Sequence, residues 1–185
     1  MKLNKTVFKD IGKVLKDKDA KREINIRASR DVIALSKKVI YSVHRSDMKN
    51  AVKFMAEIKK KFLALKKIGS NVGITKVAAQ EYVEAVTYYE LVKKGSLSGY
   101  KDLGVAADDY LLGLADLSGE LVRRAVNLAT KKEIEKVKDI KNFIDDLNYQ
   151  FLQFDLRDGE LRKKADMVRW NLNKLEDVLL SASLR

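Results

Sequence analysis

Apolar residues recur every three or four positions along almost the whole chain, which is the spacing that one face of an α-helix requires. Alternation of apolar and polar residues, the pattern typical of β-strands, is absent at any useful length. The chain contains no proline, and its nine glycines separate the periodic segments. We therefore predict an all-α fold, an antiparallel bundle of about seven helices.

The predicted helices cover residues 4–16, 19–45, 47–68, 73–94, 106–129, 131–153 and 158–182. Gly69 and Gly95 follow the third and fourth of them, and glycine readily adopts the left-handed backbone of a helix end. The stretch GSLSGYKDLG, residues 95–104, predicts a loop. Helices longer than 20 residues that are joined by short loops favour a bundle. We expect one domain over residues 1–185.

Composition excludes several classes of site. Because the chain has no cysteine, it cannot form disulfides, zinc–thiolate sites or a thiol nucleophile. Its one histidine, His44, excludes a His-rich metal site, and we interpret it as a polar residue at a helix end, with general base as the alternative. No apolar run approaches the roughly 18 residues of a membrane span, and the N-terminus lacks signal-peptide features. We expect a cytoplasmic protein without a membrane partner.

The formal charge of +12 is unevenly distributed. Residues 1–70 contain 20 basic and 7 acidic side chains, whereas residues 71–120 contain 4 basic and 8 acidic ones. Such an excess of positive charge favours a polyanionic partner, with nucleic acid first and an anionic membrane second.

Basic side chains interleaved with one aromatic residue gather near one face of the predicted helix 19–45. They are Arg27, Arg30, Lys37, Lys38, Tyr41 and Arg45. Cations can follow the phosphates of a single strand while an aromatic ring stacks on a base. Arg123 and Arg124 come shortly after Glu120, where they could contact phosphate or neutralise nearby acids. A solvated charged face is the alternative for each of these residues.

Two acidic pairs stand on partly apolar helix faces. Asp116 and Glu120 are four residues apart in LLGLADLSGEL, and Glu81 and Glu84 are three apart in QEYVEA, so the members of each pair share a face. If the two faces meet, four carboxylates converge and require a cation. Mg²⁺ or Mn²⁺ suits such oxygen ligands. A carboxylate-bound divalent ion beside a basic surface is typical of phosphodiester hydrolysis.

The acidic pairs also have a simpler interpretation, because acids at these spacings are common on solvated helix faces. Gly113 and Gly119, in the same helix as the second pair, each cost about 1 kcal/mol relative to alanine. Both make sense if a neighbouring helix or a ligand approaches the backbone there. Met167 follows the apolar pattern of the last helix and predicts a core or interface residue.

The segments QEYVEA and DYLLGLADLSGELVRRAVN resemble the translin family, and specifically its translin-associated factor X branch. SRDVIALSKKVIYSVHR resembles the second-helix segment of the same branch, and the C-terminal stretch from KNFIDDLNYQ onward is similar to the last helices of both branches. The resemblance spans about residues 20–183. The chain differs from the animal factor in its short 95–104 loop and in lacking a long N-terminal extension, which favours a prokaryotic, archaeal-type homologue.

The resemblance implies a helical bundle that assembles into a hollow homo-octameric barrel. It implies a Mg²⁺-dependent endoribonuclease that cleaves single-stranded RNA inside the barrel, with single-stranded DNA as a further possible ligand. The family's catalytic acids fall here on Glu81, Glu84, Asp116 and Glu120. Glu81, Glu84 and Glu120 are expected to bind the metal, and Asp116 either binds it or orients the attacking water. The alternatives are a non-catalytic nucleic-acid-binding barrel and a structural helical protein that binds membranes or acidic proteins.

Overall fold

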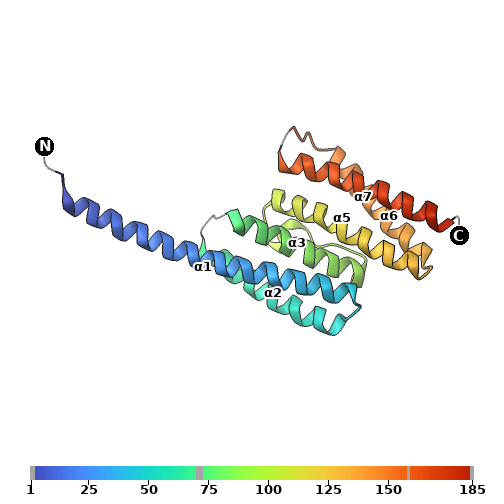
Figure 1. Cartoon of the computed structure of the whole chain (residues 1–185), viewed down its shortest axis with the longest axis horizontal. Helices are drawn as coiled ribbons and strands as arrows, with labels where there is room; N and C mark the ends of the chain where they lie inside the picture. The colour runs from blue at the N-terminus through green and yellow to red at the C-terminus, as the bar shows by residue number, and fades with distance from the viewer. Residues whose placement is uncertain (1–2, 70–72, 158, 184–185) are drawn as a thin grey trace.

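The computed structural model describes residues 3–69, 73–157 and 159–183, and every regular element in these ranges is a helix. The helices are α1 (Lys5–His44), α2 (Met48–Ile68), α3 (Gly73–Lys94), α4 (Tyr100–Leu103), α5 (Ala107–Thr130), α6 (Ile134–Leu152) and α7 (Glu160–Ser183). They pack as an elongated bundle from which the first half of α1 projects (Figure 1). The predicted all-α fold is confirmed.

The first helix, α1, runs unbroken for 40 residues, so the predicted break between residues 16 and 19 is wrong. Charged residues such as Lys16 and Lys18 continue a helix as well as they solvate a loop, and no proline interrupts the run. Asn4 caps the N-terminus, where its Oδ1 accepts a hydrogen bond from the backbone N–H of Thr6 at 3.1 Å. The second half of α1 packs against α2 and α3.

Four long helices, α1, α3, α5 and α7, lie side by side and run in the same direction (Figure 1). The α1–α3 contacts show this, because Thr75, near the start of α3, donates to Asn25 in the middle of α1 at 2.8 Å, and Tyr88 meets His44 further along both helices. In the sequence, α2 connects α1 to α3 and α6 connects α5 to α7, and both run in the opposite direction (Figure 1). Helices joined by short turns are therefore antiparallel, as predicted, whereas α1, α3, α5 and α7 are parallel to one another.

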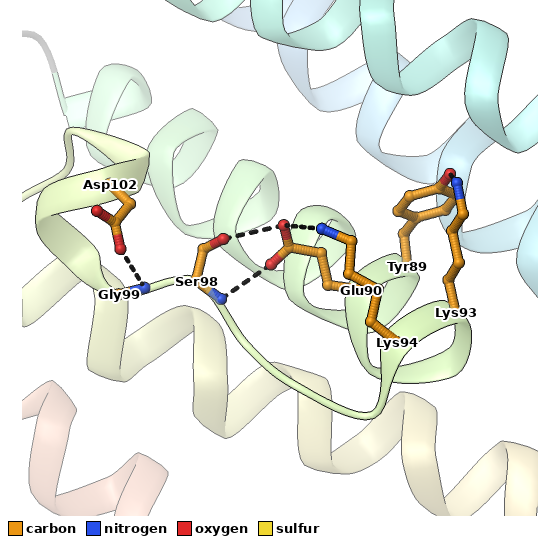
Figure 2. Close-up of polar contacts among 7 residues, drawn as sticks. All are labelled: Tyr89, Glu90, Lys93, Lys94, Ser98, Gly99 and Asp102. Atoms are coloured by element: carbon orange, nitrogen blue, oxygen red, sulfur yellow. Dashed lines mark hydrogen bonds and ion pairs between the residues drawn. The ribbon is translucent and has the colours of Figure 1, made fainter.

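The parallel pairing of α3 and α5 depends on the crossover formed by residues 95–106, which returns the chain to the start of α3 (Figure 1). Figure 2 shows how it is fixed: the buried carboxylate of Glu90 accepts hydrogen bonds from the N–H and the hydroxyl of Ser98, both at 2.9 Å. Lys94 Nζ lies 3.9 Å from the same carboxylate, and the Tyr110 hydroxyl donates to the Ser98 carbonyl at 2.9 Å. The predicted loop is confirmed except that it contains one helical turn, α4.

Helices α3 and α5 approach each other closely at Gly113. A Cβ atom at this position would lie 2.7 Å from both the carbonyl oxygen of Gln80 and the Cβ of Val83. Gly119 is different, because a Cβ there would meet only the side chain of Asn171, at 3.9 Å. Helix contact therefore explains Gly113, whereas Gly119 keeps space open beside the acids.

The hydrophobic core follows the inner faces of the helices, and Tyr88, Ile58 and Leu117 are among its largest fully buried side chains. No helix in the described ranges is long and apolar enough to cross a membrane.

Candidate active site

The four candidate acids lie around one cavity of about 600 Å³. Glu81 and Glu84 come from α3, and Asp116 and Glu120 come from α5. The remaining lining residues are Lys37, Ile40, Tyr41, Gly119, Arg123 and Met167. Helices α3 and α5 are parallel neighbours. The face of α3 that carries Glu81 and Glu84 and the face of α5 that carries Asp116 and Glu120 therefore line the same cavity.

Glu84 carries the strongest electrostatic perturbation of the four. Its burial, followed by the negative charges of Asp116, Glu81 and Glu120 in that order, raises the pKa of the carboxyl to about 8. Burial also raises the pKa of Glu81, although the nearby ammonium of Lys37 opposes that increase. The α3 side of the cavity therefore holds its acids with too little positive charge to keep both ionised at neutral pH.

Glu120, in contrast, already has close partners within the protein. Its Oε2 shares a hydrogen bond with Nε2 of His44, whose side chain is only 6% exposed. The Tyr88 hydroxyl lies 3.1 Å from Nδ1 of the same ring, and a guanidinium nitrogen of Arg123 lies 3.8 Å from Glu120 Oε2. The hydrogen bond with His44 lowers the pKa of Glu120 and outweighs the effect of its burial.

Asp116 has a cationic partner on the neighbouring helix α7. Nζ of Lys164, which comes from α7, forms an ion pair with Asp116 Oδ1. The two side chains are 25% and 29% exposed, so this is a half-buried contact rather than a solvated surface pair. The cavity thus brings together two acids with protein counter-ions, Asp116 and Glu120, and two, Glu81 and Glu84, that form no ion pair with any residue in the described part of the chain.

The walls of the cavity combine cations with aromatic and apolar surface. Lys37 and Tyr41 from α1 and Arg123 from α5 contribute to its lining. The Arg45 guanidinium lies over the Tyr41 ring, 5.5 Å from its centroid, and donates a hydrogen bond to the Tyr41 hydroxyl at 3.2 Å. Tyr41 is 55% exposed, so its ring remains accessible to a ligand.

Other predicted nucleic-acid contacts lie elsewhere. Arg27 and Arg30 are exposed on α1 but do not line the cavity. Lys38 turns toward α2, where its ammonium lies 5.6 Å from the centroid of the Phe54 ring. Arg124 interacts with the hydroxyl of Tyr88. Burial raises the pKa of Tyr88 to about 12, and the charge of Arg124 partly opposes that increase. Of the two neighbouring arginines on α5, Arg123 is therefore the one that lies beside Glu120 and lines the cavity.

Comparison with known proteins identifies the family. A model of the translin family matches residues 20–185. The chain belongs to the translin family. It is 32% identical over 168 residues to an uncharacterised protein of Methanocaldococcus jannaschii, covering 86% of this chain and 75% of that protein. It is 26% identical over 195 residues to the translin-associated protein X homolog of Schizosaccharomyces pombe, covering 92% and 84% of the two chains.

Solved structures share the fold of this translin-family chain. The crystal structure of apo-NeC3PO superposes with a TM-score of 0.86 at 30% identity, over 98% of both chains. The AfC3PO–duplex RNA complex superposes with a TM-score of 0.84 at 22% identity, over 96% of both chains. The match extends over nearly the whole chain, so α1 and the crossover are included in the common fold.

The residues of the cavity provide the donors that a hard divalent ion prefers, since four carboxylates face one space. In the described ranges, however, no three His, Asp or Glu side chains are arranged so that they could hold a metal ion as they stand. The ion pairs explain this, because Glu120 points to His44 and Asp116 to Lys164. The donor set fits Mg²⁺ or Mn²⁺, and an ion held by Glu81, Glu84 and Glu120 would require Glu120 to leave His44.

Sequence reasoning undervalued three residues of this site. His44 ends α1, as expected, but its side chain is buried, and its ring contacts Glu120 and Tyr88. Met167 lines the cavity, and Lys164 neutralises Asp116 across the α5–α7 contact. Helical periodicity places Lys164 and Met167 three residues apart on one face of α7 and was the available signal, but it could not show which helix that face meets.

Proposed function

We propose that this translin-family chain is a divalent-metal-dependent endoribonuclease that acts on single-stranded RNA within a closed homo-oligomer. The observation that carries the proposal is the single cavity lined by Glu81, Glu84, Asp116 and Glu120, with Lys37 and Arg123 on its walls. Family membership and the RNA complex of AfC3PO support the nucleic-acid ligand. The net charge of +12 supports it independently.

In this proposal Glu81, Glu84 and Glu120 hold the metal, and the raised pKa of Glu84 reflects a carboxylate that needs a cation to stay ionised. A bound Mg²⁺ ion would supply Lewis-acid polarisation of the phosphodiester and a lowered pKa of bound water. Asp116 orients the water whose oxygen attacks phosphorus, while the bond from phosphorus to the leaving oxygen breaks. Lys37 and Arg123 hold the phosphate by charge, and Tyr41 offers its exposed ring to a base.

One observation favours a second candidate, a nucleic-acid-binding barrel without catalysis. Both Asp116 and Glu120 already have counter-ions within the protein, so the cavity is partly neutralised without any metal. A protein that only binds RNA would use the same cationic walls and would keep these ion pairs permanently closed. The two functions differ in whether a divalent ion is needed for turnover.

The deciding experiment incubates the purified protein with a labelled single-stranded RNA in Mg²⁺ or in EDTA, beside two variants. Glu120→Ala removes a proposed metal ligand, and Glu176→Ala removes an exposed acid of α7 as the matched control. We expect Mg²⁺-dependent cleavage in the wild type and the control, and a loss of about 10³-fold in Glu120→Ala, equivalent to about 4 kcal/mol of transition-state stabilisation. RNA binding and oligomeric size should be retained.

Cleavage by Glu120→Ala at a rate near that of the wild type would refute the metal site. Tight RNA binding with no cleavage by any of the proteins would favour the binding barrel. An oligomer of different size in Glu120→Ala would require Glu120→Gln, which preserves the shape of the side chain and a hydrogen bond with His44.

A further inference from the structure

Lys164 approaches the acids from a helix that contributes none of them. It stands on α7, its ammonium forms an ion pair with Asp116, and its positive charge lowers the pKa of both Glu81 and Glu84 against the dominant effect of burial. Its influence therefore extends over three of the four carboxylates. The neighbouring Lys163 is exposed and is not among the residues that influence these pKa values.

A lysine ammonium and a divalent cation compete for the negative charge of the same group of carboxylates, because Lys164 pairs with Asp116 and its charge also acts on Glu81 and Glu84. Nζ of Lys164 contacts Oδ1 of Asp116, and an ion bound among the acids would repel this ammonium while attracting the carboxylate. The lysine side chain has a flexible four-carbon stem and three rotatable donors, so it can turn away without a change in the backbone. Because Asp116 lines the cavity and the pair is about one quarter exposed, the ammonium lies beside the cavity without being fully enclosed.

We propose that Lys164 is a positioning residue that holds Asp116 while the acids lack a divalent ion, and that its ammonium passes to an RNA phosphate when the ion binds. The inference rests on the proposed function and deepens it. It assigns the α7 cation two successive partners, first a carboxylate and then a phosphate. Metal and RNA then strengthen each other's binding, because the ion releases a cation that the RNA uses.

A structural ion pair that only ties α5 to α7 makes different predictions. In that case the removal of Lys164 would lower the free energy of unfolding and would leave metal affinity unchanged or weaker, since Asp116 would lose its orientation. Under the proposal, removal of the competing cation tightens metal binding. The direction of the change in affinity therefore separates the two roles.

The test measures Mn²⁺ binding to the full-length protein without RNA, by electron paramagnetic resonance of the free ion. Lys164→Met is compared with Lys163→Met, which removes the same charge from the next residue, and with Lys164→Arg, which keeps the charge. We expect Lys164→Met to bind Mn²⁺ about tenfold more tightly than Lys163→Met, equivalent to about 1.4 kcal/mol. Lys164→Arg should bind Mn²⁺ as the wild type does.

A second measurement follows single-stranded RNA binding by fluorescence anisotropy, in EDTA and in Ca²⁺, which also prefers oxygen ligands. In EDTA, Lys164→Met and Lys163→Met should bind RNA equally, because Lys164 is held by Asp116. In Ca²⁺, we expect Lys164→Met to bind RNA about fivefold more weakly than Lys163→Met. The wild type should bind RNA more tightly in Ca²⁺ than in EDTA.

Equal Mn²⁺ affinity in Lys164→Met and Lys163→Met, with normal circular dichroism, would overturn the proposal while the metal site stands. Weaker Mn²⁺ binding in Lys164→Met would overturn it in favour of the structural ion pair. If the wild type itself binds no Mn²⁺ and Glu84→Gln behaves identically, the proposed metal function fails, and the role of Lys164 fails with it.

Discussion

Replacing Glu84 by glutamine should stabilise the metal-free protein at neutral pH. Burial raises the pKa of this carboxyl to about 8, whereas its value in the unfolded chain is near 4.5. The folded state therefore holds its proton more tightly than the unfolded state does. Stability is full below the unfolded pKa and is lost as pH rises from about 4.5 through about 8. Glutamine has nearly the same shape and does not titrate, so the variant should not show this loss.

The magnitude follows from the two pKa values. At pH 7 the unfolded chain has released the proton and the folded chain has not, which corresponds to about 3 kcal/mol of unfolding free energy at about 1.4 kcal/mol per pKa unit. At pH 5 the same difference is less than about 1 kcal/mol. In urea, with a slope of about 2 kcal/mol per molar, we expect the midpoint of Glu84→Gln to exceed that of the wild type by about 1.5 M at pH 7.

Urea unfolding in EDTA, at equal protein concentration and at pH 5 and pH 7, tests this prediction. Glu57→Gln, an exposed acid of α2, is the control and should follow the wild type at both pH values. Adding Mg²⁺ should stabilise the wild type at pH 7 and stabilise Glu84→Gln less, since the ion favours an ionised carboxylate. An equal difference between the wild type and Glu84→Gln at both pH values would refute the reasoning.

Two further predictions concern the scaffold that brings the acids together. Gly113→Ala should lower the unfolding free energy by about 2 kcal/mol, because the new Cβ would lie 2.7 Å from backbone and side-chain atoms of α3. Gly119→Ala, in the same helix but with no atom closer than 3.9 Å, should change it by less than about 1 kcal/mol, and equal effects in urea unfolding would contradict the close α3–α5 contact. Glu90→Ala should cost about 2 kcal/mol, because it leaves the N–H and hydroxyl of Ser98 without their buried acceptor. Hydrogen exchange should then increase across residues 95–104, and unchanged protection of that segment would show that the crossover does not depend on Glu90.

The helices, their apolar faces and the two acidic pairs could all be predicted from the sequence, because each depends on spacing within about 25 residues. The break predicted near residue 17 was wrong, since a charged stretch without glycine or proline is as compatible with a helix as with a loop. Periodicity also placed Lys38 with the basic residues of the predicted helix 19–45, whereas its ammonium lies over the ring of Phe54 on α2. The first error reflects a local pattern that suits two structures, and the second arises because the contact of Lys38 is made with another helix.

Only the tertiary structure determined which charged residues of the site neutralise one another. Helical spacing predicts that Glu81 and Glu84 share one face and that Asp116 and Glu120 share another. The crossover at residues 95–106 makes α3 and α5 parallel, and this brings the two pairs to one cavity. His44 and Lys164 reach Glu120 and Asp116 across 76 and 48 residues of sequence. Periodicity identifies the face of a helix, because that face follows from local geometry. The partner of that face depends on how the whole chain packs, and in this protein the packing sets the charge of the site.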